Sequence, residues 1–389
     1  MPMTGFQITP LDAAIFRDGR PFAQGEYALT MPFPFPSVLA GGMRSLAGAP
    51  DYRNIPQLLR IRQTGPFLLA GREGEPPELA VAAPADAVPY ELTAEMTGPI
   101  ELAYLQARKV AEGRGAPLPE PLTELMMGGR SEKVSKRMPS FWSWPVMENW
   151  LLRPGPRTAE PSALGPPPLP HSRRTHVAIL PKSRTADDGM LFSTTGLEFQ
   201  TNGAKPDGWD PWQFSLYSGF EFPVGLSGVP KLPTVEALGG EGRLAKWEAA
   251  SLRLPECPAE LQENEGKLRR YRFVLLTPGA FAGGWCPRWL QTGSGSPPEQ
   301  SEIQVRLISA SIPRGLPISG WDLHLKKAKA SRLLVPAGSV YIVESKSDLS
   351  PLWFRSISDE EQDRLDGFGL VALGKVAPAD GDSNWKEGK

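Results

Sequence analysis

Hydrophobic and polar residues alternate over short stretches along most of the chain, and this pattern predicts strands rather than long helices. Apolar, β-branched and aromatic residues dominate the stretches, and turn-forming residues separate them. The predicted strands cover residues 6–16, 58–70 with a break at Gly65-Pro66, 171–182, 189–201, 244–254, 271–276, 302–310 and 335–344.

Two short helices are predicted among these strands. Ser37 is a suitable N-cap for a helix with apolar side chains at 38–46. Ser358 and Glu361 have the spacing of a capping box, and Gly367-Phe368-Gly369 ends the helix that they open. A helix, a glycine-rich turn and a terminal strand in this order are how a βαββαβ unit closes.

The remaining segments are predicted as loops. Residues 71–98 are rich in Pro, Ala and Glu, and 153–170 form a proline-rich linker or ordered coil. Gly and Pro bracket the segment 126–145, which favours a protruding loop or hairpin there. The 43 prolines and 40 glycines recur along all 389 residues, so we expect an α+β protein with many turns. A domain boundary is expected between 205 and 235.

Composition and charge limit the function classes. The formal net charge is -1, whereas a free-standing nucleic-acid binder usually carries a basic excess. Cys257 and Cys286 have no metal-ligand spacing, which excludes a cysteine zinc site and fits a reducing compartment. We expect no signal peptide, no membrane span and a cytoplasmic protein.

Candidate catalytic groups are few. Of the three histidines, His171 and His176 lie five residues apart in a predicted strand, so they face opposite sides. Either could serve as the general base of a ribonuclease, or simply bond locally. The sequence contains no Walker loop, no GxSxG and no HExxH motif, and we expect neither a cofactor nor a metal.

Several basic segments could instead bind phosphates. Arg17 and Arg20 surround a tight turn, and their guanidiniums suit phosphate oxygens, although a structural turn is the alternative. Arg44 lies two turns into the first predicted helix, whose N-terminus could bind a phosphate. We expect Arg44 to contact RNA, and the alternative is an ordinary surface salt bridge. The backbone of residues 367–369 could approach phosphates, or could only form a helix C-cap.

Basic residues precede aromatic ones in the segment 126–145. Single-stranded RNA suits this combination because its bases stack on rings; the alternative is a basic loop followed by a core-packed Trp pair. The runs 326–332 and 267–272 are typical of solvated charged faces.

Eight segments, in order along the chain, together resemble one family. They are LDAAIFRDGRPF (11–22), FPFPSVLAGGMRS (33–45), HVAI…GMLFSTT (176–195), LGGEGRLAKWE (238–248), LLTPGAFAGGWCP (275–287), ISGWDL (318–323), VPAGSVYIVE (335–344) and DGFGLVALG (366–374). The family is Cmr subunit three, a RAMP-superfamily component of type III-B CRISPR effector complexes.

This resemblance implies two tandem ferredoxin-like, RRM-like domains with loop insertions. The first would cover residues 1–220, with the basic and aromatic insertion at about 71–170, and the second 221–389. Residues 367–369 then lie where RAMP proteins have their glycine-rich loop, and 126–145 is our candidate for a thumb-like hairpin.

The resemblance also implies a non-catalytic subunit that holds the 5′ repeat-derived tag of the crRNA at the foot of the complex. Its partners would be the crRNA, the nearby guide–target duplex, the large polymerase/cyclase-like subunit and the adjacent RAMP backbone subunit. The alternatives are a guide-maturation endoribonuclease and a protein-only scaffold. The candidate RNA-binding residues are Arg17, Arg20, Ser37, Arg44, Arg130, Lys133, Lys136, Arg137, Lys326, Lys327, Gly367, Phe368 and Gly369.

Overall fold

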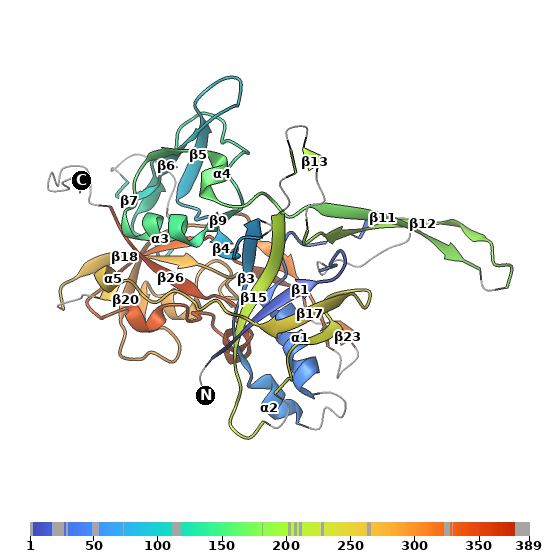
Figure 1. Ribbon diagram of the computed structural model, residues 1–389. Coiled ribbons are helices and arrows are strands. Elements are labelled where there is room, and N and C mark those ends of the chain that lie inside the picture. The colour runs from blue at the N-terminus through green and yellow to red at the C-terminus, as the bar shows by residue number, and fades with distance from the viewer. Residues whose placement is uncertain are drawn as a thin grey trace.

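Two antiparallel sheets form the body of the protein, as the computed structural model shows (Figure 1). The structure describes residues 3–17, 27–28, 30–48, 54–72, 74–110, 118–180, 182–200, 204–205, 208–209, 212–226, 229–262, 266–322, 327–328 and 330–377. Within these residues, strands far outnumber the few short helices, so the expected α+β class is confirmed.

The first sheet has the strand order β16-β17-β1-β15-β3-β4-β9. All of its neighbouring strands are antiparallel. Its strands are β1 (Thr4–Pro10), β3 (Arg62–Arg72), β4 (Glu78–Ala82), β9 (Phe141–Ser143), β15 (Trp212–Glu221), β16 (Thr234–Ala237) and β17 (Leu244–Ala249). The last two lie beyond residue 220, so chain from both predicted domains builds this sheet.

The second sheet has the order β19-β20-β25-β18-β26 and is also antiparallel. Its strands are β18 (Arg269–Leu275), β19 (Ser294–Gly295), β20 (Val305–Ser311), β25 (Val340–Ser345) and β26 (Val371–Lys375). Both sheets contain the same pattern of four neighbours. The four strands are β17-β1-β15-β3 in one sheet and β26-β18-β25-β20 in the other. If the four strands of each set are numbered by their position along the chain, their spatial order in both sheets is 4-1-3-2.

The two sheets pack face to face. Along β3, Phe67 and Leu69 belong to a core that also contains Val274 and Ile342 of the second sheet. Leu68, between them, points to the other side and packs with α1 (Pro36–Gly48). This alternation follows from the two-residue period of a strand, and it gives each sheet a second, outer core.

Shorter elements surround this body. Three-stranded sheets are formed by β5 (Ala87–Glu91), β6 (Ile100–Tyr104) and β10 (Arg157–Ala159), and by β2 (Tyr27–Ala28), β11 (His171–Ile179) and β12 (Ala186–Leu197). The strand pairs are β7 (Gln106–Arg108) with β8 (Leu125–Met127), β13 (Ala204–Lys205) with β14 (Gly208–Trp209), β21 (Leu316–Ile318) with β24 (Arg332–Leu334), and β22 (Trp321–Asp322) with β23 (Lys327–Ala328).

The remaining helices are short. They are α2 (Ile55–Leu59), α3 (Trp144–Leu152), α4 (Pro161–Leu164), α5 (Ala259–Gln262) and α6 (Glu361–Leu365), with 3-10 turns at Arg288–Leu290 and Ser350–Leu352. Among the described residues, no helix is long and apolar enough to cross a membrane.

Both predicted helices exist, but their predicted caps are wrong. The first helix begins at Pro36, so Ser37 lies inside its first turn and is not the N-cap. Proline suits this position because its missing N–H would have no partner there. Ser358 does not cap α6 either, because its hydroxyl accepts a hydrogen bond from the backbone of Ala280.

Two loop predictions are also wrong. The segment 71–98 contains the strands β4 and β5. The segment 126–145 does not protrude, since it continues into β9 at the edge of the first sheet and into α3, and Trp142 and Trp144 are buried. The protruding element is instead the hairpin β11–β12, which extends away from the body (Figure 1). We call this hairpin the arm.

Candidate nucleic-acid interface

A cleft of about 530 Å³ lies where the N-terminal end of α1 meets α6. We call it the α1–α6 cleft. It is lined by Ile15, Phe16, Arg17, Phe35, Ser37, Val38, Gly239, Gly240, Ile318, Ser319, Gly320, Ala330, Arg332, Glu360, Gln362, Asp363 and Asp366. Five of the eight family-like segments contribute to this lining, although they are spread over most of the chain.

Arg332 is a cation of the cleft whose side chain is both held in place and partly exposed. Its Nη1 donates to both carboxylate oxygens of Asp363, at 2.9 and 2.7 Å, and its guanidinium lies 5.8 Å from the ring centre of Phe368. The side chain is still 46% exposed. Within the described structure its Nε and Nη2 make no hydrogen bond, so this held guanidinium keeps donors for a phosphate.

Arg17 lies at the rim of the same cleft. Its guanidinium is 3.6 Å from the Glu241 carboxylate, and about half of the side chain is exposed. Arg20 lies outside the described residues, as does Lys326, and the side chain of Lys327 is not described. Of the predicted arginine pair, the structure therefore places only Arg17.

Arg44 lies next to the cleft with most of its side chain covered, rather than exposed in it. Its Nη2 donates to Asp366 Oδ1 at 2.5 Å and its Nε donates to the Leu58 carbonyl at 3.1 Å. The two charged side chains are only 16% and 11% exposed. Arg44 thus forms a salt bridge with Asp366, as the alternative interpretation predicted, but this bridge is largely covered and does not lie on the surface. An RNA contact by Arg44 stays a prediction.

The glycine loop 367–369 connects α6 to β26. Gly367 has φ +88° and Gly369 has φ +69°, as expected for the end of a helix. The three backbone N–H groups donate to Arg364, Asp363 and Pro278 carbonyls, and Phe368 is fully buried. The backbone of this loop is thus already bonded, and its approach to RNA stays a prediction that would use other atoms.

The basic residues of 126–145 lie elsewhere, on the three-stranded sheet of β5, β6 and β10. Arg130 pairs with Glu101 and lies over the Tyr90 ring, and Arg137 pairs with Glu91 at 2.8 Å. Lys133 and Lys136 are exposed. Because Trp142 and Trp144 are buried in the core, the alternative of a core-packed Trp pair is confirmed and no ring of this pair is available for stacking.

The arm begins beside the cleft and is anchored by ion pairs. Arg174 donates to both oxygens of Asp12, at 3.0 and 2.5 Å, and Arg243 also bonds this carboxylate. The hydrogen bond from Arg174 lowers the pKa of Asp12 below its usual value. Asp12 therefore stays charged at neutral pH, and it fixes the base of the arm to the first sheet.

The two arm histidines are not brought together. His171 pairs with Leu197 and His176 with Phe192 in the register of β11 and β12, so their side chains lie on opposite faces. His176 Nε2 is 3.0 Å from the Thr194 hydroxyl. In the part of the chain that is described, no three His, Cys, Asp or Glu residues are grouped to hold a metal ion.

Comparisons with known proteins agree with the family that the eight segments indicate. The family model described as "CRISPR-associated protein (Cas_Cmr3)" matches residues 6–376, and the chain belongs to this family. No curated protein matches the sequence.

Two solved structures match over most of the chain. One is a cryo-EM structure of the type III-B Cmr-beta bound to cognate target RNA and AMPPnP, state 1, with 15% identity, a TM-score of 0.45 and coverage of 88% of this chain and 86% of that chain. The other is the type III-B Cmr-beta bound to cognate target RNA, with 15% identity, a TM-score of 0.45 and coverage of 87% and 86%.

Proposed function

We propose that this protein is the non-catalytic, cytoplasmic subunit of a type III-B CRISPR effector that binds the 5′ tag of the crRNA at the α1–α6 cleft. The observation that supports this most directly is the convergence of five family-like segments on one cleft. Its partners are the crRNA, the nearby guide–target duplex, the large polymerase/cyclase-like subunit and a RAMP backbone subunit.

The cleft supports phosphate binding because its carboxylates are already neutralised. Asp363 pairs with Arg332, Asp366 with Arg44 and Glu360 with Arg288. Arg332 can then offer its remaining donors to phosphate oxygens, and the half-exposed Arg17 adds positive charge at the rim, without an unpaired carboxylate opposing the RNA. Such contacts fix the register of the RNA, while base edges supply specificity.

The strand order supports tandem ferredoxin-like domains. The order fourth, first, third, second, with antiparallel neighbours, is that of a βαββαβ unit, and it occurs once in each sheet. In the first sheet, α1 connects the first and second strands of the unit. In the second sheet, α6 connects the third and fourth. Among the residues that the structure describes, each unit thus shows one of the two helices of the motif.

A protein-only scaffold remains the second candidate. The net charge of the chain is -1, and each carboxylate that lines the cleft is paired with an arginine, so the cleft has no large positive excess.

Measuring RNA binding distinguishes the tag-binding subunit from the scaffold. We expect the full chain, alone and with the large subunit, to bind a 5′-tagged guide RNA. We expect Arg17→Ala/Arg332→Ala to weaken binding at least tenfold, since a charge-assisted hydrogen bond contributes about 1.5 kcal/mol or more.

The salt dependence identifies the cause. Removing two phosphate contacts makes the slope of log K against log salt shallower by about 1.4 for single-stranded RNA. Arg355→Ala is the matched control, because Arg355 is similarly exposed and ion-paired with Glu221 outside the cleft. Equal affinity and equal slope in the cleft variant would favour the scaffold.

A further inference from the structure

Five charged side chains connect the rim of the α1–α6 cleft to the arm. In spatial order they are Arg17, Glu241, Arg243, Asp12 and Arg174, and we call them the rim network. Positive and negative groups alternate along it, so each of the three inner groups lies between two partners of opposite charge. The network begins in the lining of the cleft and ends on β11, in the arm (Figure 1).

Glu241 lies between two arginines without being bonded closely to either. Its Oε1 is 3.6 Å from Nη2 of Arg17, and its Oε2 is 3.5 Å from Nη2 of Arg243. Both distances exceed the range of about 2.7–3.2 Å that is typical of a hydrogen bond, so this carboxylate can approach either arginine. The backbone of its turn is anchored, because the N–H of Gly240 donates to the Ile15 carbonyl at 2.7 Å. Only the side chain of Glu241 therefore has to move.

Asp12 is shared by two arginines at the other end of the network. Its Oδ2 accepts a hydrogen bond from Nη1 of Arg243 at 2.5 Å and another from Nη1 of Arg174 at 3.0 Å. The two arginines compete for this oxygen, and Arg174 has the longer bond. If Arg243 withdraws, Arg174 can shorten this bond and hold both oxygens of Asp12 as a stronger bidentate pair.

Arg243 is the element that both ends of the network can influence. Its side chain is only 18% exposed, and its buried Nε has no hydrogen-bond partner among the described residues, so only its contacts with the two carboxylates hold the guanidinium. The charge of Glu241 also acts as far as Arg174: the hydrogen bond to Asp12 raises the pKa of Arg174, and the negative charge of Glu241 adds to this. A shared group with two arrangements is what energetic coupling between sites requires.

We propose that the rim network couples the α1–α6 cleft to the arm, so that an anion at the rim fastens the root of the arm. A phosphate beside Arg17 neutralises this arginine and repels Glu241. Glu241 then moves toward Arg243 and draws it away from Asp12. Asp12 in turn holds Arg174 more closely. That the anion is an RNA phosphate rests on the proposed function, whereas the coupling is a property of the chain itself.

Hydrogen exchange of the full chain tests the coupling without RNA. Arg17→Ala releases Glu241 as an anion would. We therefore expect the amides of the arm root, residues 171–175 and 193–197, to exchange about twofold more slowly, which is the size of effect that exposed ion pairs allow. In a Glu241→Gln background, Arg17→Ala is expected to have no effect. Roughly 1 M salt is expected to abolish the slowing, because it screens exposed charges.

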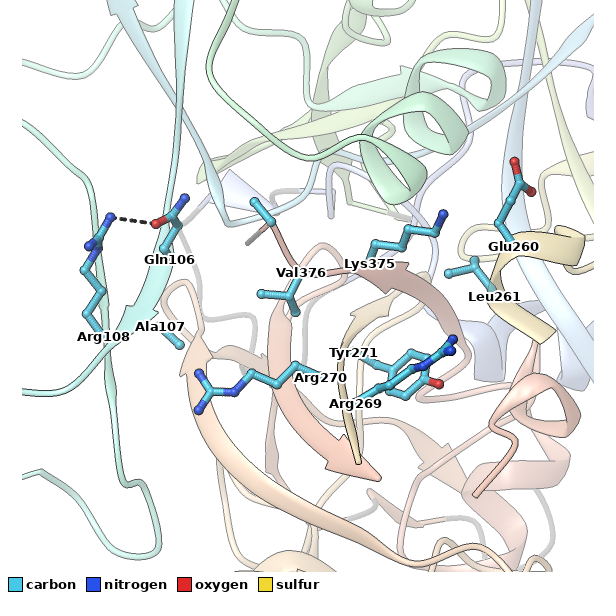
Figure 2. A pocket seen from close by; sticks show the side chains of 11 residues that line it. Gln106, Ala107, Arg108, Glu260, Leu261, Arg269, Arg270, Tyr271, Lys375 and Val376 are labelled. Atoms are coloured by element: carbon cyan, nitrogen blue, oxygen red, sulfur yellow. Dashed lines mark hydrogen bonds between the residues drawn. The ribbon is translucent and has the colours of Figure 1, made fainter. Parts of the chain in front are cut away.

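A similar network elsewhere in the molecule supplies the matched control. Arg306, Glu344, Arg270 and Glu124 also alternate in charge, and Arg306 is about half exposed, as Arg17 is. Figure 2 shows Arg270 in the wall of a pocket of about 610 Å³, at the other end of β26 from the glycine loop. In the described part of the chain this second network makes no ion pair with the arm. Arg306→Ala is therefore expected to leave exchange at the arm root unchanged.

A second measurement separates the coupling from the proposed function. A short RNA that consists of the tag alone is expected to slow exchange at the arm root of the wild type, and to slow it less in Glu241→Gln. If the wild type does not bind this RNA, the tag-binding function fails, but the result with Arg17→Ala still decides the coupling. Unchanged or faster exchange at the arm root in Arg17→Ala, or equal slowing with and without Glu241→Gln, overturns the coupling.

Discussion

At the scale of single residues, burial divides the arginines in and beside the α1–α6 cleft into two groups. Arg332 and Arg17 are about half exposed and line the cleft, whereas Arg44 is enclosed with Asp366. An exposed ion pair contributes little to stability, because water screens it. A buried pair that loses one partner leaves an uncompensated charge in the interior. The same change to alanine should therefore have different effects at these positions.

We expect Arg44→Ala to lower the free energy of unfolding by about 3 kcal/mol, because the largely buried Asp366 loses its ion-pair partner. Urea unfolding measures this. Arg288→Ala is the control, because its pair with Glu360 is about 60% exposed on both sides and should contribute less than about 1 kcal/mol. If Arg44→Ala leaves stability unchanged and abolishes RNA binding, Arg44 is an RNA contact rather than a structural residue.

The sequence indicated part of this site and missed another part. Arg17, Ser37 and Asp366 lie in segments that resemble the family, and the structure brings all three to one cleft. Arg332 belongs to a basic run that is typical of a solvated face. Its partner Asp363 is 31 residues away along the chain, so only the fold shows that this arginine is held in place.

At the scale of elements, the end of α6 depends on close contact with β3. A Cβ on Gly367 would lie 2.7 Å from the Gly65 carbonyl oxygen, and Gly367 has φ +88°. Gly284 has a similar φ of +79°, but nothing lies within 4 Å of its Cβ position. Comparing alanine substitutions at the two glycines therefore separates two contributions to the loss of stability: the left-handed backbone conformation, which both share, and the close contact, which only Gly367 makes.

We expect Gly284→Ala to lower the free energy of unfolding by about 1–2 kcal/mol, which is the cost of a left-handed conformation. Gly367→Ala should cost about 1–3 kcal/mol more, because the clash forces α6 and β3 apart. Chemical unfolding of both variants measures the difference. Equal losses would show that α6 moves without cost and that the contact with β3 does not require glycine.

The elements that could be predicted from the sequence are those with a regular spacing of apolar residues and with turn-forming residues at both ends. Four of the five strands of the second sheet (all but β19), the helix at 36–48 and the strands of the arm belong to this group. The strand β4 was missed because it is only five residues long and prolines precede it. Basic residues followed by Trp142 suggested a protruding hairpin, since a sequence does not show whether a ring faces solvent or core.

At the scale of the whole molecule, one buried ion pair joins three parts of the chain. Arg272 of β18 donates from Nη1 to Asp86 Oδ2 at 2.7 Å and from Nε to the Lys375 carbonyl at 2.7 Å. Trp150 of α3 donates to the other oxygen of Asp86 at 2.9 Å. Both charged side chains are 0% exposed. The interpretation of 267–272 as a solvated face is therefore wrong for Arg272.

This pair connects the second sheet, α3 and the segment that leads into β5, so it fixes the position of the small sheet on the body. Its burial follows from the β18 pattern, because Arg272 lies between Tyr271 and Phe273 and faces α3. We expect Arg272→Met to lower the free energy of unfolding by about 3–5 kcal/mol, since Asp86 loses its countercharge in the interior. Lys246→Met is the control, because the Lys246–Glu248 pair is exposed and should contribute less than about 1 kcal/mol.

A second substitution tests whether the lost countercharge causes the effect. Arg272→Met/Asp86→Leu removes both charges, so it should recover part of the loss seen with Arg272→Met alone. Recovery should be incomplete, because the Lys375 and Leu151 carbonyls and the Trp150 indole also lose their partners. Urea unfolding of the wild type, the two single variants and the double variant measures this coupling. Asp86→Leu alone is measured in the same way to complete the cycle. If the losses of Arg272→Met and Asp86→Leu simply add in the double variant, the two side chains stabilise the body independently, and the ion pair does not join its parts.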